Sequence, residues 1–146
     1  MEYRIKVFVD TNVLVDYLLP DRLRHQQAVE LFELILAVKI EAAFSTQSML
    51  DAMYICRNQE KCPEEMLRRS LQGLLSCTNA SYVHPSALGQ ALKDPNPDVE
   101  DSAHIAFAYD ECCDVIITND KKLLSREVPR PMLVMTPEDF VDKCRA

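Results

Sequence analysis

The sequence has only two glycines among its 146 residues, and it has no long uncharged apolar stretch. With 48% hydrophobic and 27% charged residues, it has the composition of an ordinary helix-rich globular protein. Because no run of about 18 or more uncharged apolar residues occurs, no membrane-spanning segment is predicted. A predicted strand begins at Arg4, which leaves no room for a signal peptide, so we expect a cytoplasmic protein.

The six cysteines lack the C-x-x-C spacing of a zinc site. Cys112 and Cys113 are adjacent and have no histidine at ligand spacing, so they cannot form an ordinary zinc clip. We therefore expect reduced thiols rather than a disulfide framework.

Basic residues are in the minority, since 16 lysines and arginines stand against 23 aspartates and glutamates, for a net charge of -7. A protein drawn to nucleic acid by long-range attraction usually carries a basic surface, which this composition does not indicate. The acidic excess has two explanations. It can be ordinary solubilising surface, or part of it can be a carboxylate cluster that a divalent cation neutralises.

The order of the predicted elements indicates the fold. Short β-rich segments are separated by helical segments whose apolar residues recur at the spacing of one helix face. The predicted strands are residues 4–9, 42–44, 82–83, 114–118 and 132–135. Strands that alternate with helices predict an α/β fold in which helices cover both faces of a parallel sheet. We expect a single domain over residues 1–146.

Four aspartates follow, or lie within about one turn of, the predicted carboxyl ends of strands and the starts of helices: Asp10, Asp51, Asp101 and Asp120. Because parallel strands end at the same edge of a sheet, these side chains are expected to meet in one pocket. Each also has a structural explanation as a helix cap or a solvent-facing charge. Together they would repel one another unless a cation lay among them, and hard oxygen ligands select Mg²⁺ or Mn²⁺.

Three motifs carry a resemblance to a known family: V-D-T-N-V-L at 9–14, E-D at 100–101 and I-I-T-N-D at 116–120. In this order they resemble a PIN domain, and the chain is similar to the PIN ribonucleases that include the VapC toxins. The resemblance implies a three-layer α/β/α sandwich, metal-dependent cleavage of RNA, often a homodimer, and a possible antitoxin partner. It also implies that Asp10, Asp101 and Asp120 are the acids that hold the metal. Asp51 occupies a position where the family usually has glutamate.

The same resemblance suggests supporting residues, which are Thr11, Asn12, Glu100, Thr118 and Asn119. Ions held by the aspartates would polarise the scissile phosphate and lower the pKa of an attacking water. Basic residues near the predicted edge are expected to contact phosphates, although solvated surface charge also explains them: Arg22, Arg24, Lys121 and Lys122.

Two other classes of enzyme and signalling protein fit this sequence less well. Dehalogenase-like phosphatases need a second aspartate two positions after the first, where this chain has Asn12, and a receiver domain needs an extra acid where Val9 stands. A PIN fold used only for binding, without catalysis, is the main alternative.

His104 is predicted to be a hydrogen-bonded core residue. The five tyrosines and five phenylalanines are spread at core spacing, so no base-stacking platform is predicted.

Overall fold

A sheet of five parallel strands forms the centre of the protein, in the order β3-β2-β1-β4-β5. The structure is a computed structural model that describes residues 3–59 and 62–146. Its strands are β1 (Lys6–Val9), β2 (Glu41–Ser45), β3 (Asn79–Ser81), β4 (Val115–Ile117) and β5 (Leu133–Met135). The chain adds β2 and β3 on one side of β1, then returns to add β4 and β5 on the other side. The prediction of a parallel sheet is confirmed.

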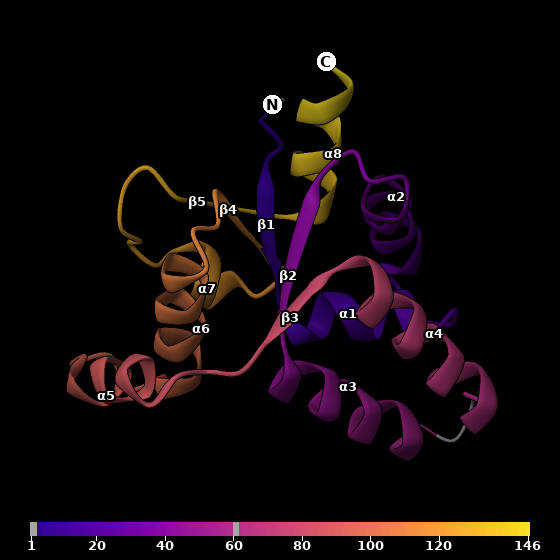
Figure 1. Cartoon of the computed structure of the whole chain (residues 1–146), viewed down its shortest axis with the longest axis horizontal. Coiled ribbons are helices and arrows are strands. Elements are labelled where there is room, and N and C mark those ends of the chain that lie inside the picture. The colour runs from indigo at the N-terminus through magenta and orange to yellow at the C-terminus, as the bar shows by residue number, and fades with distance from the viewer. Residues whose placement is uncertain (1–2, 60–61) are drawn as a thin grey trace.

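Helices connect the strands and cover both faces of the sheet. They are α1 (Thr11–Leu18), α2 (His25–Leu36), α3 (Thr46–Asn58), α4 (Glu64–Cys77), α5 (Pro85–Lys93), α6 (Val99–Asp110), α7 (Lys121–Leu124) and α8 (Pro137–Arg145). In Figure 1, α1 to α4 and α8 lie on one side of the strands, and α5, α6 and α7 lie on the other. This is the predicted three-layer α/β/α sandwich. None of the helices in the described residues is long and apolar enough to span a membrane.

Two apolar cores separate the three layers. Successive residues of a strand point to opposite faces of the sheet. Val7 and Val9 therefore enter the larger core, which α1, α2, α3, α4 and α8 complete. Phe8, between them, enters the smaller core and packs edge-on against Phe107 of α6, with ring centroids 5.6 Å apart. The pattern explains why β1 is apolar at every one of these positions, as a central strand covered on both faces should be.

The third strand lies earlier in the sequence than predicted. Residues 82–83 have strong β propensity, but the strand is Asn79–Ser81. The register explains the difference, because Ser81 pairs with Ser45, the last residue of β2. Because β2 ends there, the described residues offer Tyr82 and Val83 no strand to pair with, and their intrinsic preference has no effect.

The carboxyl ends of β1 and β4 lie side by side, where Val9 pairs with Ile117. This is the point at which the sheet order reverses, since the connection after β1 leads to β2 and the one after β4 leads to β5. Open α/β sheets bind ligands in the crevice at such a point.

Candidate active site

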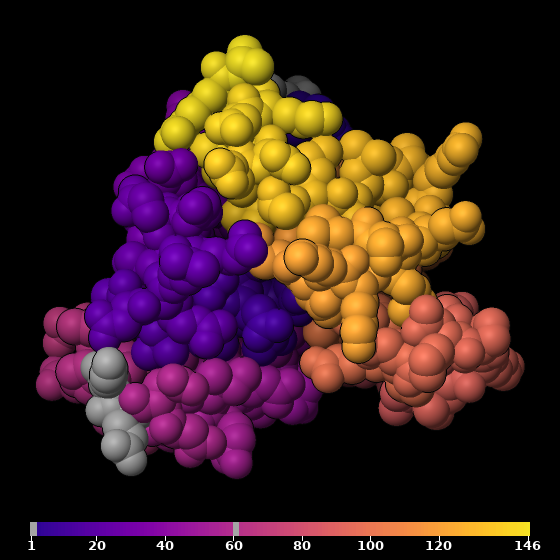
Figure 2. All heavy atoms as spheres, turned by 180° about the vertical axis from the view of Figure 1, so that it is seen from behind, coloured from indigo at the N-terminus to yellow at the C-terminus, as the bar shows by residue number. Residues whose placement is uncertain are grey.

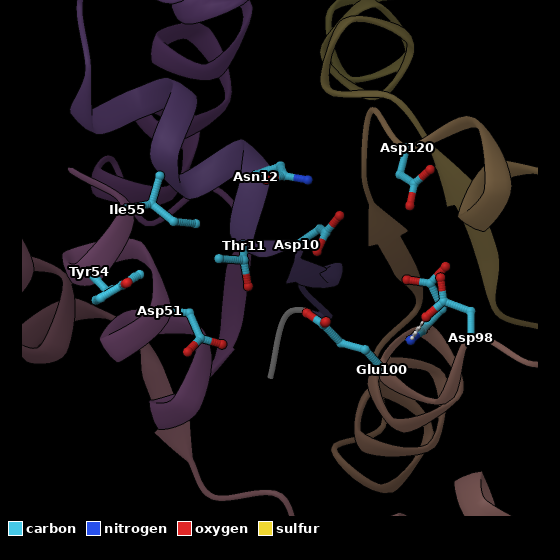
Figure 3. A pocket seen from close by; sticks show the side chains of 10 residues that line it. Asp10, Thr11, Asn12, Asp51, Tyr54, Ile55, Asp98, Glu100 and Asp120 are labelled. Carbon is cyan, nitrogen blue, oxygen red and sulfur yellow. Dashed lines mark hydrogen bonds between the residues drawn. The ribbon is translucent and has the colours of Figure 1, made fainter. Parts of the chain in front are cut away.

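A pocket of about 370 Å³ lies at this edge of the sheet (Figure 3). Its lining comes from the start of α1, from α3, from the first turn of α6 and from the residue before α7. The described residues that line it are Asp10, Thr11, Asn12, Asp51, Tyr54, Ile55, Asp98, Glu100, Asp101 and Asp120. The structure thus brings together all four aspartates that the sequence singled out, from widely separated parts of the chain.

Asp10 is held by a tertiary contact rather than by its own helix. It occupies the N-cap position of α1, but its side chain accepts no capping hydrogen bond. Instead, the Thr118 hydroxyl, which is completely buried, donates to Oδ2 of Asp10 over 2.8 Å. The explanation of Asp10 as a helix cap is therefore wrong. Asp10 is only 6% exposed as a residue, and it lines the pocket.

Asp98 and Asp120 do act as caps. Asp98 Oδ1 accepts from the backbone N–H of Asp101 over 3.1 Å, which fixes the start of α6. Asp120 Oδ1 accepts from the backbone N–H of Lys122 over 3.0 Å at the start of α7. A capping role and a place in the pocket are compatible, since each cap uses one oxygen.

Asp101 is the most strongly perturbed acid in the pocket. It is buried in the first turn of α6, and its Oδ2 is a buried atom without a hydrogen-bond partner among the described residues. Burial, followed by the negative charges of Asp98, Asp120 and Asp10, raises the pKa of Asp101 from 3.8 to about 7. A carboxylate in this position gains from any cation that replaces its lost hydration.

Asp51 and Glu100 face each other across the pocket (Figure 3). Asp51 lies in the second turn of α3 and accepts a hydrogen bond from the side chain of Gln47 over 2.8 Å. The start of the helix is fixed by Ser45, whose hydroxyl accepts from the backbone N–H of Ser48 over 3.0 Å. Glu100 is exposed on α6. Asp51 is partly exposed and lines the pocket.

His104 lies behind Asp10 in the smaller core. It is buried, and its ring lies 5.3 Å from that of Phe8. The prediction of a hydrogen-bonded core histidine is wrong in one respect, because Nδ1 has no hydrogen-bond partner among the described residues. The nearest acid atom is Oδ1 of Asp10, at 3.7 Å. His104 follows Asp101 by three residues, so both lie on the same face of α6.

A second hollow adjoins the pocket and shares Asn12 and Asp120 with it. Figure 2 shows indigo atoms of the N-terminal segment at the floor of a hollow between purple, orange and magenta parts of the surface. The residues that line this second hollow of about 550 Å³ are Asn12, Asp16, Asp21, Arg22, Leu23, Arg24, Asn119 and Asp120. It therefore contains two of the four predicted phosphate contacts, while Lys121 and Lys122 are exposed on α7 and line neither hollow.

The two arginines of this hollow differ in their surroundings. Arg22 Nε donates to the buried carboxylate of Asp16 over 2.9 Å, so its guanidinium already has a structural partner. Arg24 is exposed, and its Nη1 donates to the side-chain oxygen of Asn119 over a long 3.4 Å. Arg24 is thus the better placed of the two to bind an anion from solution.

The donor set of the pocket fits a hard divalent cation, because every acidic side chain in it offers carboxylate oxygens. Among the described residues, however, no three histidine, cysteine or acidic side chains already converge closely enough to hold a metal ion. Burial raises the pKa of Asp101 most, and the neighbouring carboxylates raise it further, so a bound cation would favour the charged form of this side chain. The buried Oδ2 of Asp101 has no hydrogen-bond partner among the described residues and would be available to such a cation.

Tyr54 and Ile55 line the pocket but were not predicted as site residues. They follow Asp51 by three and four residues, so helical periodicity could have placed them on its face.

The core assignment of the aromatic residues is correct for the phenylalanines, which are all buried. It is wrong for four of the tyrosines, which are exposed: Tyr3, Tyr54, Tyr82 and Tyr109.

The sequence and the fold both match known proteins. Residues 6–122 match the family model of the PIN domain, so the chain belongs to the PIN domain family. It is 27% identical over 146 residues to ribonuclease VapC1 of Aquifex aeolicus, and the match covers 94% of each chain. The fold is similar to that of Mycobacterium tuberculosis VapC20, a sarcin-ricin loop cleaving toxin, with a TM-score of 0.67, 14% identity and coverage of 86% of this chain and 98% of that one.

A further similar structure belongs to a complex. VapBC2 from Rickettsia felis, bound to a DNA fragment from its promoter, contains a chain that matches with a TM-score of 0.61 and 16% identity. The match covers 90% of this chain and 98% of that one. At this level of identity the likeness shows the shared fold.

Proposed function

We propose that this protein is a divalent-metal-dependent endoribonuclease and the toxin of a toxin–antitoxin pair. The observation that carries the proposal is the meeting of Asp10, Asp51, Asp101 and Asp120 in one pocket at the switch point of the sheet. Membership of the PIN family and the similarity to a VapC ribonuclease support it.

In this proposal Asp10, Asp101 and Asp120 hold Mg²⁺ or Mn²⁺, and Asp51 and Glu100 assist them. A divalent ion in such a site polarises a phosphodiester and makes a bound water more acidic. The chain's own contribution is to keep the carboxylates aimed at one place. Thr118 does so for Asp10 through its hydrogen bond, and the Asp98 cap does so for the first turn of α6.

Other polar groups at the edge are available to the substrate. The Thr11 hydroxyl is buried and has no hydrogen-bond partner among the described residues, and Asn12 is exposed beside it. We assign these two, together with Asn119, to hydrogen bonding with phosphate oxygens. Arg24, Lys121 and Lys122 supply positive charge to the neighbouring phosphates, with Arg22 in a mainly structural role. Because the pocket itself is acidic, RNA binding should depend on the cation.

We further propose that the whole chain works as one domain. The last helix, α8, lies beyond the residues matched by the family model, and its Phe140 and Val141 are buried in the larger core. A homodimer, a cognate antitoxin and a cytoplasmic location are part of the same proposal, as expected of a VapC-like toxin.

The test is cleavage of RNA by the purified protein with Mg²⁺ or Mn²⁺, compared with the Asp10→Asn and Asp120→Asn variants. Asp110→Asn is a matched control, because Asp110 is exposed at the far end of α6, about 13 Å along the helix from Asp101. We expect activity in the wild type and the control and its loss in both site variants. Equal behaviour of all four proteins would support the alternative of a PIN fold that only binds.

A further inference from the structure

One wall of the pocket is apolar, which binding of a cation by carboxylates does not explain. Of the ten described residues that line it, eight are polar or acidic and two, Tyr54 and Ile55, are largely carbon. These two are neighbours on α3, one turn beyond Asp51. Figure 3 shows them together on the side of the pocket opposite Asp98 and Asp120.

The Tyr54 ring is largely exposed, as are the rings of three other tyrosines. It is 69% exposed, whereas every phenylalanine is buried. Within the described residues, no hydrogen bond holds its hydroxyl, and no other aromatic ring packs against it. The ring therefore offers a flat apolar face at the edge of a site for a highly charged substrate.

We propose that Tyr54 is a binding residue for a nucleobase next to the scissile phosphate, with Ile55 as the floor of this subsite. The inference rests on the proposed ribonuclease function and adds to it the part of the substrate that the carboxylates cannot recognise. Acidic side chains and a cation interact with phosphate and water. A base is planar and aromatic, and it stacks on exposed tyrosine rings in many proteins that bind single-stranded nucleic acid.

A protein partner is the competing occupant of this surface. Leu50 is 61% exposed one turn before Tyr54, so the two form a short apolar strip along α3. The strip is narrow, however, because the polar residues Gln47, Asp51 and Arg57 flank it on the same helix. Interfaces between proteins need a broader apolar centre, whereas one ring is sufficient for one base.

The experiment compares RNA cleavage by the wild type and by Tyr54→Phe, Tyr54→Ala and Tyr109→Ala. Tyr109 is the matched control, because it is 56% exposed on α6 and lines a different hollow, beside Arg126. The probe is a single-stranded RNA oligonucleotide in which the wild-type cut has been mapped. Versions with an abasic nucleotide on either side of that cut are compared with it.

Stacking of one base predicts that Tyr54→Ala raises KM about tenfold, while Tyr54→Phe and Tyr109→Ala stay near the wild type. One abasic substitution should raise KM of the wild type by a similar factor. That substitution should have no further effect on Tyr54→Ala, because the partner of the missing base is already gone.

Two results would overturn the inference, and they differ in whether the ribonuclease proposal also fails. If the wild type cleaves RNA but Tyr54→Ala has the same KM and the same response to abasic substrates, the subsite is wrong and the ribonuclease proposal stands. This includes the case in which Tyr54→Ala changes only the oligomeric state or the binding of a protein partner. If the wild type cleaves no RNA with Mg²⁺ or Mn²⁺, both proposals fail.

Discussion

The Thr118 hydroxyl joins two acidic positions that lie far apart in the sequence. It donates to Oδ2 of Asp10 over 2.8 Å and accepts from the backbone N–H of Asp120 over 3.0 Å. Thr118 is completely buried at the end of β4, next to β1 in the sheet. One side chain therefore sets both the orientation of Asp10 and the path of the chain into Asp120.

The Thr118→Val variant keeps the shape of this residue and removes both hydrogen bonds. We expect its free energy of unfolding to fall by about 1–2 kcal/mol, because the buried carboxylate of Asp10 loses a donor. Cleavage should fall about ten- to hundredfold, as it does when groups that orient metal ligands are removed. Denaturant unfolding and initial cleavage rates measure the two effects. Thr118→Ser keeps the hydroxyl and should recover most of the activity; an inactive serine variant would argue against this role.

The raised pKa of Asp101 makes stability depend on pH. Its pKa is about 7 in the folded protein, compared with the ordinary value of 3.8 in the unfolded chain. Below pH 3.8 Asp101 is protonated in both states, so its full contribution to stability is present. As the pH rises towards 7, the unfolded chain releases the proton first, and the free energy of unfolding falls until the folded carboxyl has also ionised.

A bound divalent cation would offset this loss, so Mg²⁺ should raise Tm more at about pH 8 than at about pH 5.5. In the presence of EDTA at about pH 8, Asp101→Asn should be more stable than the wild type by about 1 kcal/mol, since it removes a poorly solvated charge. The same variant should gain no stability from Mg²⁺. Thermal denaturation with Mg²⁺ or EDTA at the two pH values measures this. An equal Mg²⁺ effect at both pH values, in wild type and variant alike, would contradict the assignment of Asp101.

Arg22 and Arg24 should respond differently to removal of their charge. Arg22→Ala leaves the buried carboxylate of Asp16 without its ion-pair partner, so we expect a loss of about 1–2 kcal/mol of stability. Arg24→Ala should leave stability unchanged, raise KM for RNA a few-fold and weaken its dependence on salt. Denaturant unfolding and KM at two salt concentrations separate the two roles. The opposite pattern would mean that Arg22, rather than Arg24, contacts the substrate.

Arg126 fixes the first turn of α6 from outside the pocket. One of its terminal nitrogens, Nη2, donates to the Ser102 hydroxyl over 2.8 Å and to Asp94 over 3.2 Å. We expect Arg126→Ala to lower the free energy of unfolding by about 2 kcal/mol and to weaken Mn²⁺ binding, because Ser102 follows Asp101 directly. Arg130 is exposed, and Arg130→Ala is the control. Unfolding curves and Mn²⁺ titrations that match for the two variants would exclude this positioning role.

The sequence is sufficient to predict the fold because its local signals agree with one another. Apolar strands such as Val7–Val9, the Ser45 cap and the Thr136–Pro137 helix start each point to the element that forms there. The exception is the third strand, where residues 82–83 have the stronger propensity. Pairing with β2 decides its position, and pairing is a tertiary property that propensity does not contain.

The acidic residues of the candidate site could be predicted from the sequence, but the surroundings of each side chain could not. The acids were found because parallel strands must end at one edge, which is a rule of topology. The environment of each side chain was not predictable, because it depends on contacts between distant segments. The Thr118–Asp10 hydrogen bond, the unpartnered Nδ1 of His104 and the exposure of Tyr54 all depend on such contacts.

The central claim is that Asp10, Asp101 and Asp120 share one divalent cation. The most direct test is a titration of Mn²⁺ into the wild type, Asp10→Asn, Asp101→Asn and the control Asp110→Asn, followed by electron paramagnetic resonance of the free ion. We expect Asp10→Asn and Asp101→Asn each to weaken Mn²⁺ binding at least about tenfold, while Asp110→Asn binds as the wild type does. Equal Mn²⁺ affinity in all four proteins would contradict the claim.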